Sequence, residues 1–263
     1  MGIDKRRSEQ MSELNKRIST LVKLLDEYTL RVDTNQASVV HGNFLEINER
    51  NLIERDPNAF FLGLISDQSV LTHVSWSLPY KLSLRLGHIN VGTLASEFSS
   101  EMLEQVIRKS PALHRYPSTI SRYIWSASKR ISQYYDSDIS NVWKYDTSAI
   151  TVIQKMMEFN GIGAKKANLG CLMLINDYGI ELVDRGAINM ADDVHVRRVC
   201  NRVHIIDSNI SKVVSEFGKL LCPEFPGKYS TVLWLIGRNY CRPTKPLCDK
   251  CPIRITCISA DKI

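Results

Sequence analysis

Apolar residues recur every three or four positions along most of this chain. Between residues 8 and 32, Leu14, Ile18 and Leu21 follow this spacing, with charged residues between them, which is the pattern of an amphipathic helix. Similar segments follow one another from residue 57 onward, and the sequence contains no convincing apolar–polar alternation of the kind that predicts strands. The pattern therefore predicts an all-α fold.

Polar residues, prolines and glycines separate the predicted helices. The most apolar stretch, residues 59–87, predicts one long helix that ends or kinks near Pro79, and then a turn that Gly87 closes. The other predicted helices cover residues 91–111, 118–136, 146–160, 164–177, 192–206, 208–221 and 227–241.

Composition and charge narrow the class of protein only a little. The 263 residues are 44% hydrophobic, and 34 Lys and Arg against 28 Asp and Glu give a net charge of +6. This mild cationic bias is compatible with a nucleic-acid partner, and many proteins without one share it. No run approaches 20 apolar residues, and no apolar segment follows the charges of the first ten residues, so we expect an intracellular protein that is not secreted and has no membrane partner. We also expect a monomer. In that environment the seven cysteines are expected to stay reduced.

Four of those cysteines lie close together near the C-terminus, with the spacing C-x6-C-x2-C-x5-C: Cys241, Cys248, Cys251 and Cys257. Four thiolates in so short a loop require a soft cation, and an S4 ligand set suits either zinc or an iron–sulfur cluster. The other three lie in apolar surroundings and are predicted to be packed core thiols: Cys171, Cys200 and Cys222.

A second motif joins two predicted helices. The segment FNGIGAKKAN, residues 159–168, holds Gly161 and Gly163, which allow the chain to reverse within a few residues. The next helix then begins with exposed N–H groups, which form an anion site. Such a hairpin can hold a DNA phosphate without reading sequence, although a simple tight turn is at least as common.

Together these segments resemble one family. The cysteine spacing, the preceding IGRNYC, the glycine hairpin and the segment ADDVHVRRVCNRV are similar to motifs of endonuclease III and related helix–hairpin–helix DNA glycosylases, and occur in the same order. The segment LISDQ resembles a further family motif, and other parts of the chain look closer to a less-studied branch. The hairpin departs from the family pattern where Phe159 and Asn160 replace leucine and proline.

The resemblance implies roles for particular residues. Lys165 takes the place of the family's nucleophile, and Asp193 that of its catalytic carboxylate, with the adjacent Asp192 as a rival. The implied cofactor is a [4Fe–4S] cluster on Cys241, Cys248, Cys251 and Cys257. The implied DNA contacts are the hairpin glycines, Lys166, and Gln68, which would fill the gap left by an extruded base. Arg242 and Lys245 of the cysteine loop would bind phosphates.

The chemistry of Lys165 makes one demand on its surroundings. An amine that attacks C1′ of a deoxyribose must be neutral, whereas a free lysine is protonated at neutral pH. A neighbouring cation and a helix N-terminus both disfavour the ammonium form. We therefore hypothesise that Lys166 helps to keep Lys165 deprotonated, with simple phosphate binding as its alternative role.

The resemblance also implies an architecture and a function. It implies two all-α domains with the active site in the cleft between them: a helical barrel with the hairpin at residues 56–177, and an iron–sulfur domain from residues 1–55 plus 178–263. It implies a base-excision-repair DNA glycosylase with AP lyase activity, acting on duplex DNA that contains a lesion or an abasic site. The alternatives are a monofunctional glycosylase that uses Asp193 and water, and a non-catalytic, metal-stabilised DNA-binding protein. The target base stays open.

Overall fold

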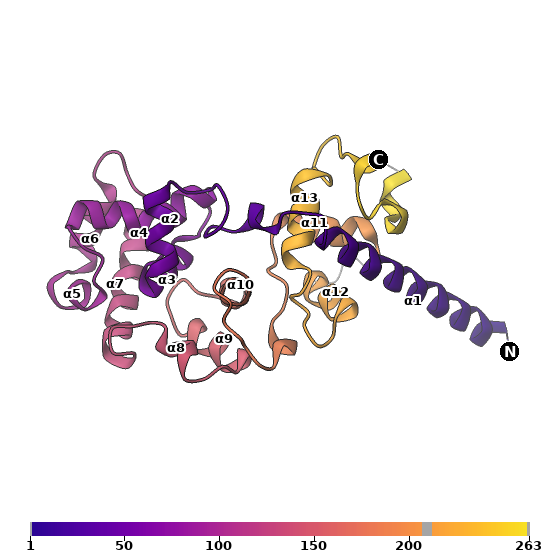
Figure 1. The fold of residues 1–263 in the computed structure, drawn as a ribbon, viewed down its shortest axis with the longest axis horizontal. Helices are drawn as coiled ribbons and strands as arrows, with labels where there is room; N and C mark the ends of the chain where they lie inside the picture. The colour runs from indigo at the N-terminus through magenta and orange to yellow at the C-terminus, as the bar shows by residue number, and fades with distance from the viewer. Residues whose placement is uncertain (1, 207–211, 262–263) are drawn as a thin grey trace. The chain divides into compact units, whose positions relative to one another are not determined.

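The computed structural model describes residues 2–206 and 212–261, and these residues form helices joined by loops (Figure 1). Within the described ranges there is no β-sheet, only an isolated parallel bridge between Ser148 and Val183. None of the helices described is long and apolar enough to cross a membrane. The predicted all-α fold is confirmed.

The chain divides into two compact units. The middle unit is Ser38–Val183, and the terminal unit combines Met1–Ala37 with Asp184–Ile263. The division predicted from the sequence differs at both boundaries: it grouped residues 38–55 and 178–183 with the chain ends. Helix α2 (Ile47–Arg55) packs on α3 (Pro57–Ser66) and α4 (Thr72–Leu86) of the middle unit. Its buried Ile53 accepts a hydrogen bond from the Tyr178 hydroxyl at 2.7 Å.

The middle unit is organised around one apolar helix. Helix α3 is buried on all sides from Ala59 to Ser66, and Asp56 caps its start by accepting hydrogen bonds from the N–H groups of the first turn. The helices that follow α3 in this unit are α4 (Thr72–Leu86), α5 (Val91–Glu97), α6 (Ser100–Arg108), α7 (Pro117–Tyr134), α8 (Asn141–Lys144), α9 (Ala149–Met157) and α10 (Ala164–Asn176); α2, α4, α7 and α10 contact α3. Both α5 and α6 pack on α7, and α10 contacts α9 and α3 (Figure 1).

The predicted long helix over residues 59–87 is wrong in one respect. The chain breaks between α3 and α4, at residues 67–71, and Pro79 lies inside α4. The break follows from the polar residues after Ser66 and from the left-handed backbone of Ser69, with a φ of 53°. Gly87 ends α4 in a left-handed conformation, as predicted.

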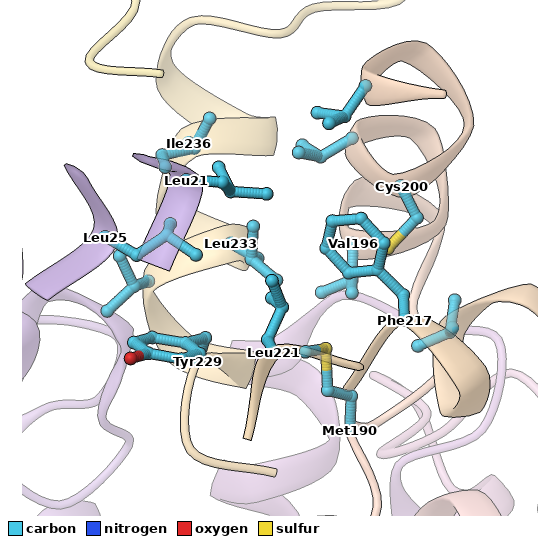
Figure 2. Close-up of a cluster of buried hydrophobic side chains, with 14 of the residues drawn as sticks. Leu21, Leu25, Met190, Val196, Cys200, Phe217, Leu221, Tyr229, Leu233 and Ile236 are labelled. Atoms are coloured by element: carbon cyan, nitrogen blue, oxygen red, sulfur yellow. The ribbon is translucent and has the colours of Figure 1, made fainter. Parts of the chain in front are cut away.

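The terminal unit has its own apolar core. Its main helices are α1 (Gly2–Thr29), α11 (Val194–Val203), α12 (Val213–Leu221) and α13 (Ser230–Asn239); residues 208–211 of the predicted helix 208–221 lie outside the described residues. Leu21 and Leu25 of α1 are fully buried, and Figure 2 shows them in the same cluster as Phe217 of α12 and Leu233 of α13. Short 3₁₀ turns occur at Thr34–Ala37, Arg185–Ala187, Cys248–Lys250, Arg254–Thr256 and Ile258–Asp261.

Candidate functional site

The glycine hairpin connects α9 to α10 in the middle unit. Gly161 has a φ of +88°, and a Cβ there would lie 2.5 Å from Cδ2 of Tyr123, so that only glycine fits. The buried Phe159 attaches the turn to α3, because its ring packs edge to face on Phe61 with the centroids 4.7 Å apart. The predicted reversal between two helices is therefore present, and its glycine has a steric reason.

The start of α10 is open. Gly163 is the residue before the first turn, and a Cβ built on it would have no atom within 4 Å apart from those of its chain neighbours. Gly163 occupies the N-cap position and has no side chain with which to cap the helix. The N–H groups of its first turn thus lack an intrahelical partner and carry the positive end of the helix dipole, which is the physical basis of an anion site.

The two lysines that follow have different surroundings. Lys165 is exposed to solvent. Lys166 is half-buried, and its Nζ donates a hydrogen bond to the Ile65 carbonyl oxygen at 2.6 Å. Burial lowers the pKa of Lys166 to about 8, Asp67 opposes the change, and Lys165 adds to the lowering. Lys165 thus disfavours the ammonium form of Lys166, and the hypothesis that Lys166 helps to keep Lys165 deprotonated stays a prediction.

Lys166 reaches a second group of residues at the end of α3. The imidazole of buried His114 lies 3.1 Å from the Ser66 carbonyl oxygen through Nε2, and burial lowers its pKa, with Lys166 contributing. The backbone N–H of Gln68 donates to the same Ser66 oxygen at 2.8 Å. No local pattern could predict the Lys166 and His114 contacts, because the partners lie 101 and 48 positions apart.

The two adjacent aspartates belong to the terminal unit, at the start of α11. Asp193 caps this helix, with Oδ1 accepting a hydrogen bond from the His195 N–H at 2.7 Å. Asp192 forms an ion pair with Arg197, whose Nε lies 3.0 Å from its Oδ1. The rival carboxylate is therefore held by an arginine, and the cap occupies one oxygen of Asp193.

The four clustered cysteines line a single small cavity, together with Arg202, Tyr240 and Arg254. Cys241 and Cys251 also pack against the apolar core of the terminal unit. Burial raises the pKa of Cys251 to about 11, and the other three cysteines add to this effect. Four thiols that repel one another's negative charge in this way need a multiply charged cation to become thiolates together.

The four cysteine thiols are suitable ligands for a metal group, and they surround one cavity. Across residues 2–206 and 212–261, no three His, Cys, Asp or Glu side chains stand in the geometry of a metal site. The four cysteines are nevertheless the side chains gathered around this cavity that could hold one. The predicted core thiols lie apart from them: Cys171, Cys200 and Cys222 are buried, and burial raises the pKa of Cys171 and Cys200 to about 12.

Two arginines of α11 hold the cysteine loop to the unit. Arg198 donates from Nη2 to the Gly237 carbonyl at 2.9 Å and from Nε to the Cys241 carbonyl at 2.5 Å. Arg202 donates to the Arg242 carbonyl at 2.7 Å and to Sγ of Cys241 at 3.4 Å. The side chains of Arg242 and Lys245 are exposed on the loop. Sequence reasoning did not identify the role of Arg202.

Comparison with known proteins agrees with this description. No family model matches the chain. Over 119 residues it is 33% identical to endonuclease III of Rickettsia felis, covering 43% of this chain and 49% of that protein. Over 117 residues it is 26% identical to endonuclease III of Thermotoga maritima, covering 44% and 50%. The chain thus matches about half the length of these relatives.

Solved structures share the fold over nearly the whole chain. A trapped endonuclease III–DNA covalent intermediate superposes with a TM-score of 0.64 at 17% identity, covering 93% of this chain and 97% of that one. A thermostable thymine-DNA glycosylase superposes with a TM-score of 0.61 at 14% identity, covering 96% and 99%.

The residues described form an all-helical fold with a glycine hairpin and a four-cysteine loop, and this fold is similar to that of endonuclease III. The sequence similarity over about half of those relatives and the shared fold support the resemblance to the helix–hairpin–helix (HhH-GPD) DNA glycosylases that the motifs indicate.

Proposed function

We propose that this protein is a base-excision-repair DNA glycosylase that acts on duplex DNA and also cleaves the resulting abasic site. The observation that carries the proposal is the open start of α10, where uncapped N–H groups and the exposed Lys165 lie side by side on one hairpin. A phosphate bound there would bring the sugar backbone of DNA next to a primary amine. The similarity to endonuclease III supports the same reading.

Lys165 is the better candidate for the attacking amine. Its side chain is exposed, whereas the amine of Lys166 is bound to the Ile65 carbonyl. In the proposed reaction a damaged or mismatched base rotates out of the duplex, as chemistry on a base requires. The neutral amine attacks C1′, the N-glycosidic bond breaks, and the base leaves with the bonding electrons and takes up a proton.

The second half of the reaction cuts the strand. The sugar ring opens as the amine nitrogen forms a Schiff base with C1′, and loss of a C2′ proton expels the 3′-phosphate. Asp193 would stabilise the positive charge that develops on the sugar and accept the proton that the amine releases. Its helix cap leaves it with a fixed side-chain position and, through Oδ2, a second oxygen for that role.

The cysteine loop would serve DNA binding. Cys241, Cys248, Cys251 and Cys257 would hold a [4Fe–4S] cluster, whose positive irons supply the charge that lets four thiolates share one cavity. Arg198 and Arg202 hold the loop through its backbone carbonyls, so that the exposed Arg242 and Lys245 are available to phosphates.

The experiment that tests the proposal is a panel of duplexes with one lesion each: uracil, a thymine mismatch, an oxidised purine and an oxidised pyrimidine. Base release and strand cleavage are followed separately. We expect release of at least one base together with a nick that needs no alkali, and loss of both in Asp193→Asn. Release without nicking would support the monofunctional alternative, and the absence of turnover on every duplex would support a non-catalytic DNA-binding protein.

A further inference from the structure

The end of α3 carries two backbone carbonyls that the helix itself cannot satisfy in full. Each receives a side chain from elsewhere in the middle unit: Lys166 donates to the Ile65 oxygen at 2.6 Å, and His114 contacts the Ser66 oxygen at 3.1 Å. We call these two side chains the α3 clamp. One comes from the start of α10, and the other from the loop before α7.

The clamp depends on a close approach of α10 to α3. Gly170 lies one turn after Lys166, so both residues are on the same face of α10. A Cβ on Gly170 would lie 2.9 Å from Cδ2 of Leu64. The two helices therefore touch at Gly170, and the lysine side chain spans the remaining distance to the last turn of α3.

Gln68 lies two residues after Ser66, whose carbonyl is the second of the two clamped groups. Its backbone N–H donates to the same Ser66 oxygen that His114 contacts, at 2.8 Å. The chain then continues through Ser69, whose positive φ turns it toward α4. The position of Gln68 is thus set by the Ser66 carbonyl, which the clamp holds in place. Lys166 connects the end of α3 to the first turn of α10, the helix that follows the glycine hairpin.

We infer that Lys166 is a positioning residue: with His114 it clamps the end of α3 and so holds Gln68 at a fixed place relative to the phosphate-binding hairpin. The inference rests on the proposed function, in which the hairpin holds the backbone while Gln68 fills the space of the extruded base. Both contacts must then form at once on one distorted duplex, and a rigid link between them lowers the entropy lost on binding.

Burying the charged amine of Lys166 costs free energy, and this cost favours a specific role for the lysine. Burial makes the ammonium form unfavourable, as the lowered pKa of about 8 records. A methionine would fill similar space without this cost and without the hydrogen bond. Neutral lysine still donates to the carbonyl, so the link to Ile65 persists in both protonation states.

The test uses a duplex that carries a tetrahydrofuran abasic-site analogue opposite 2-aminopurine, whose fluorescence reports on the filling of the gap. Wild-type protein at saturation is expected to change this fluorescence, and Gln68→Ala to abolish the change. Lys166→Met is expected to lose most of the change at saturation, while Lys166→Arg, which keeps a donor, retains it. Lys144→Met, at an exposed position of α8, controls for the loss of one positive charge.

Other outcomes separate the possible failures. A wild-type fluorescence change in saturated Lys166→Met overturns the inference, and weaker binding with an unchanged signal at saturation marks Lys166 as a phosphate contact only. Failure of the wild-type protein to bind either this duplex or undamaged DNA overturns the proposed function itself. If Lys166→Met does not fold, as judged by circular dichroism, His114→Leu removes the other half of the clamp, and an unchanged signal there overturns the inference equally.

Discussion

Two adjacent lysines at the start of α10 illustrate how strongly position on a helix decides chemistry. A step of one residue rotates the side chain by about 100°, which separates the exposed Lys165 from the half-buried Lys166. The exposed amine is free to meet a substrate, whereas the buried amine is bound to Ile65. The family motif could predict which lysine matches the nucleophile, but the burial of the other depends on α3, 101 positions earlier along the chain.

The lowered pKa of Lys166 predicts a pH-dependent stability. In the folded protein this lysine loses its proton near pH 8, but in the unfolded chain only near its ordinary value of 10.5. Between these values the unfolded state binds more protons, so the free energy of unfolding contributed by Lys166 increases with pH. Urea unfolding at pH 7.5 and pH 10 should therefore show wild-type protein gaining stability relative to Lys166→Met. The burial of this amine is contradicted if the difference in the free energy of unfolding between wild-type protein and Lys166→Met is the same at both pH values, or if it changes in favour of the variant at pH 10. Lys144→Met is the matched control.

At the scale of elements, close helix contacts organise both units. In the terminal unit α13 meets α11 at Gly237, where a Cβ would lie 2.6 Å from the His195 backbone oxygen. The His195 oxygen belongs to the backbone and cannot move aside as a flexible side chain could. Any residue larger than glycine at position 237 must therefore push the two helices apart. The same helix α11 carries Asp193 at its start, and Arg198 and Arg202 along its length.

Gly237→Ala is predicted to lower the stability of the protein by roughly 1–3 kcal/mol, because overpacking displaces α13 from α11. Alanine is the better helix former by about 1 kcal/mol, so without this contact the substitution would stabilise the protein. Urea unfolding measures the difference, and Thr231→Ala, at a half-buried position on the same helix, provides the comparison. Equal or higher stability of Gly237→Ala contradicts the close contact.

The helices were predictable to different degrees. Periodicity predicted those that expose a polar face, such as α6 and α11, because their apolar residues form one stripe. It failed at residues 59–87, where α3 is buried on all sides and shows no stripe. The helix was predicted to end or kink near Pro79, and it does not end there because Pro79 lies inside α4. The break lies at residues 67–71, which include the left-handed backbone of Ser69. The hairpin was predictable because Gly161 and Gly163 mark it locally.

At the scale of the whole molecule, the chain ends come together in one unit. Leu21 and Leu25 from α1 pack in the same core as α11, α12 and α13 (Figure 2). The cysteine loop joins this core through Cys241, Cys251 and Ile253. Cysteine spacing predicted the ligand set, but the attachment of the loop to α11 through Arg198 and Arg202 depends on residues about 40 positions apart, and no motif could reveal it.

Loss of the metal group is therefore predicted to destabilise the terminal unit. Purified protein should be brown and contain iron, and Cys251→Ser should lose iron and unfold at a lower temperature. Cys171→Ala, in the core of the middle unit, should keep its iron and serves as the control. Metal analysis and thermal unfolding followed by circular dichroism measure both effects. A colourless protein that contains zinc contradicts the proposed cluster.

In the proposed function the amine of Lys165 attacks the sugar of damaged DNA. Its most direct test is borohydride reduction of the protein mixed with a duplex that contains one abasic site, which converts a Schiff base into a stable protein–DNA adduct. We expect an adduct with wild-type protein and with Lys166→Met, and none with Lys165→Ala. An adduct that persists in Lys165→Ala, or that wild-type protein fails to form, contradicts it.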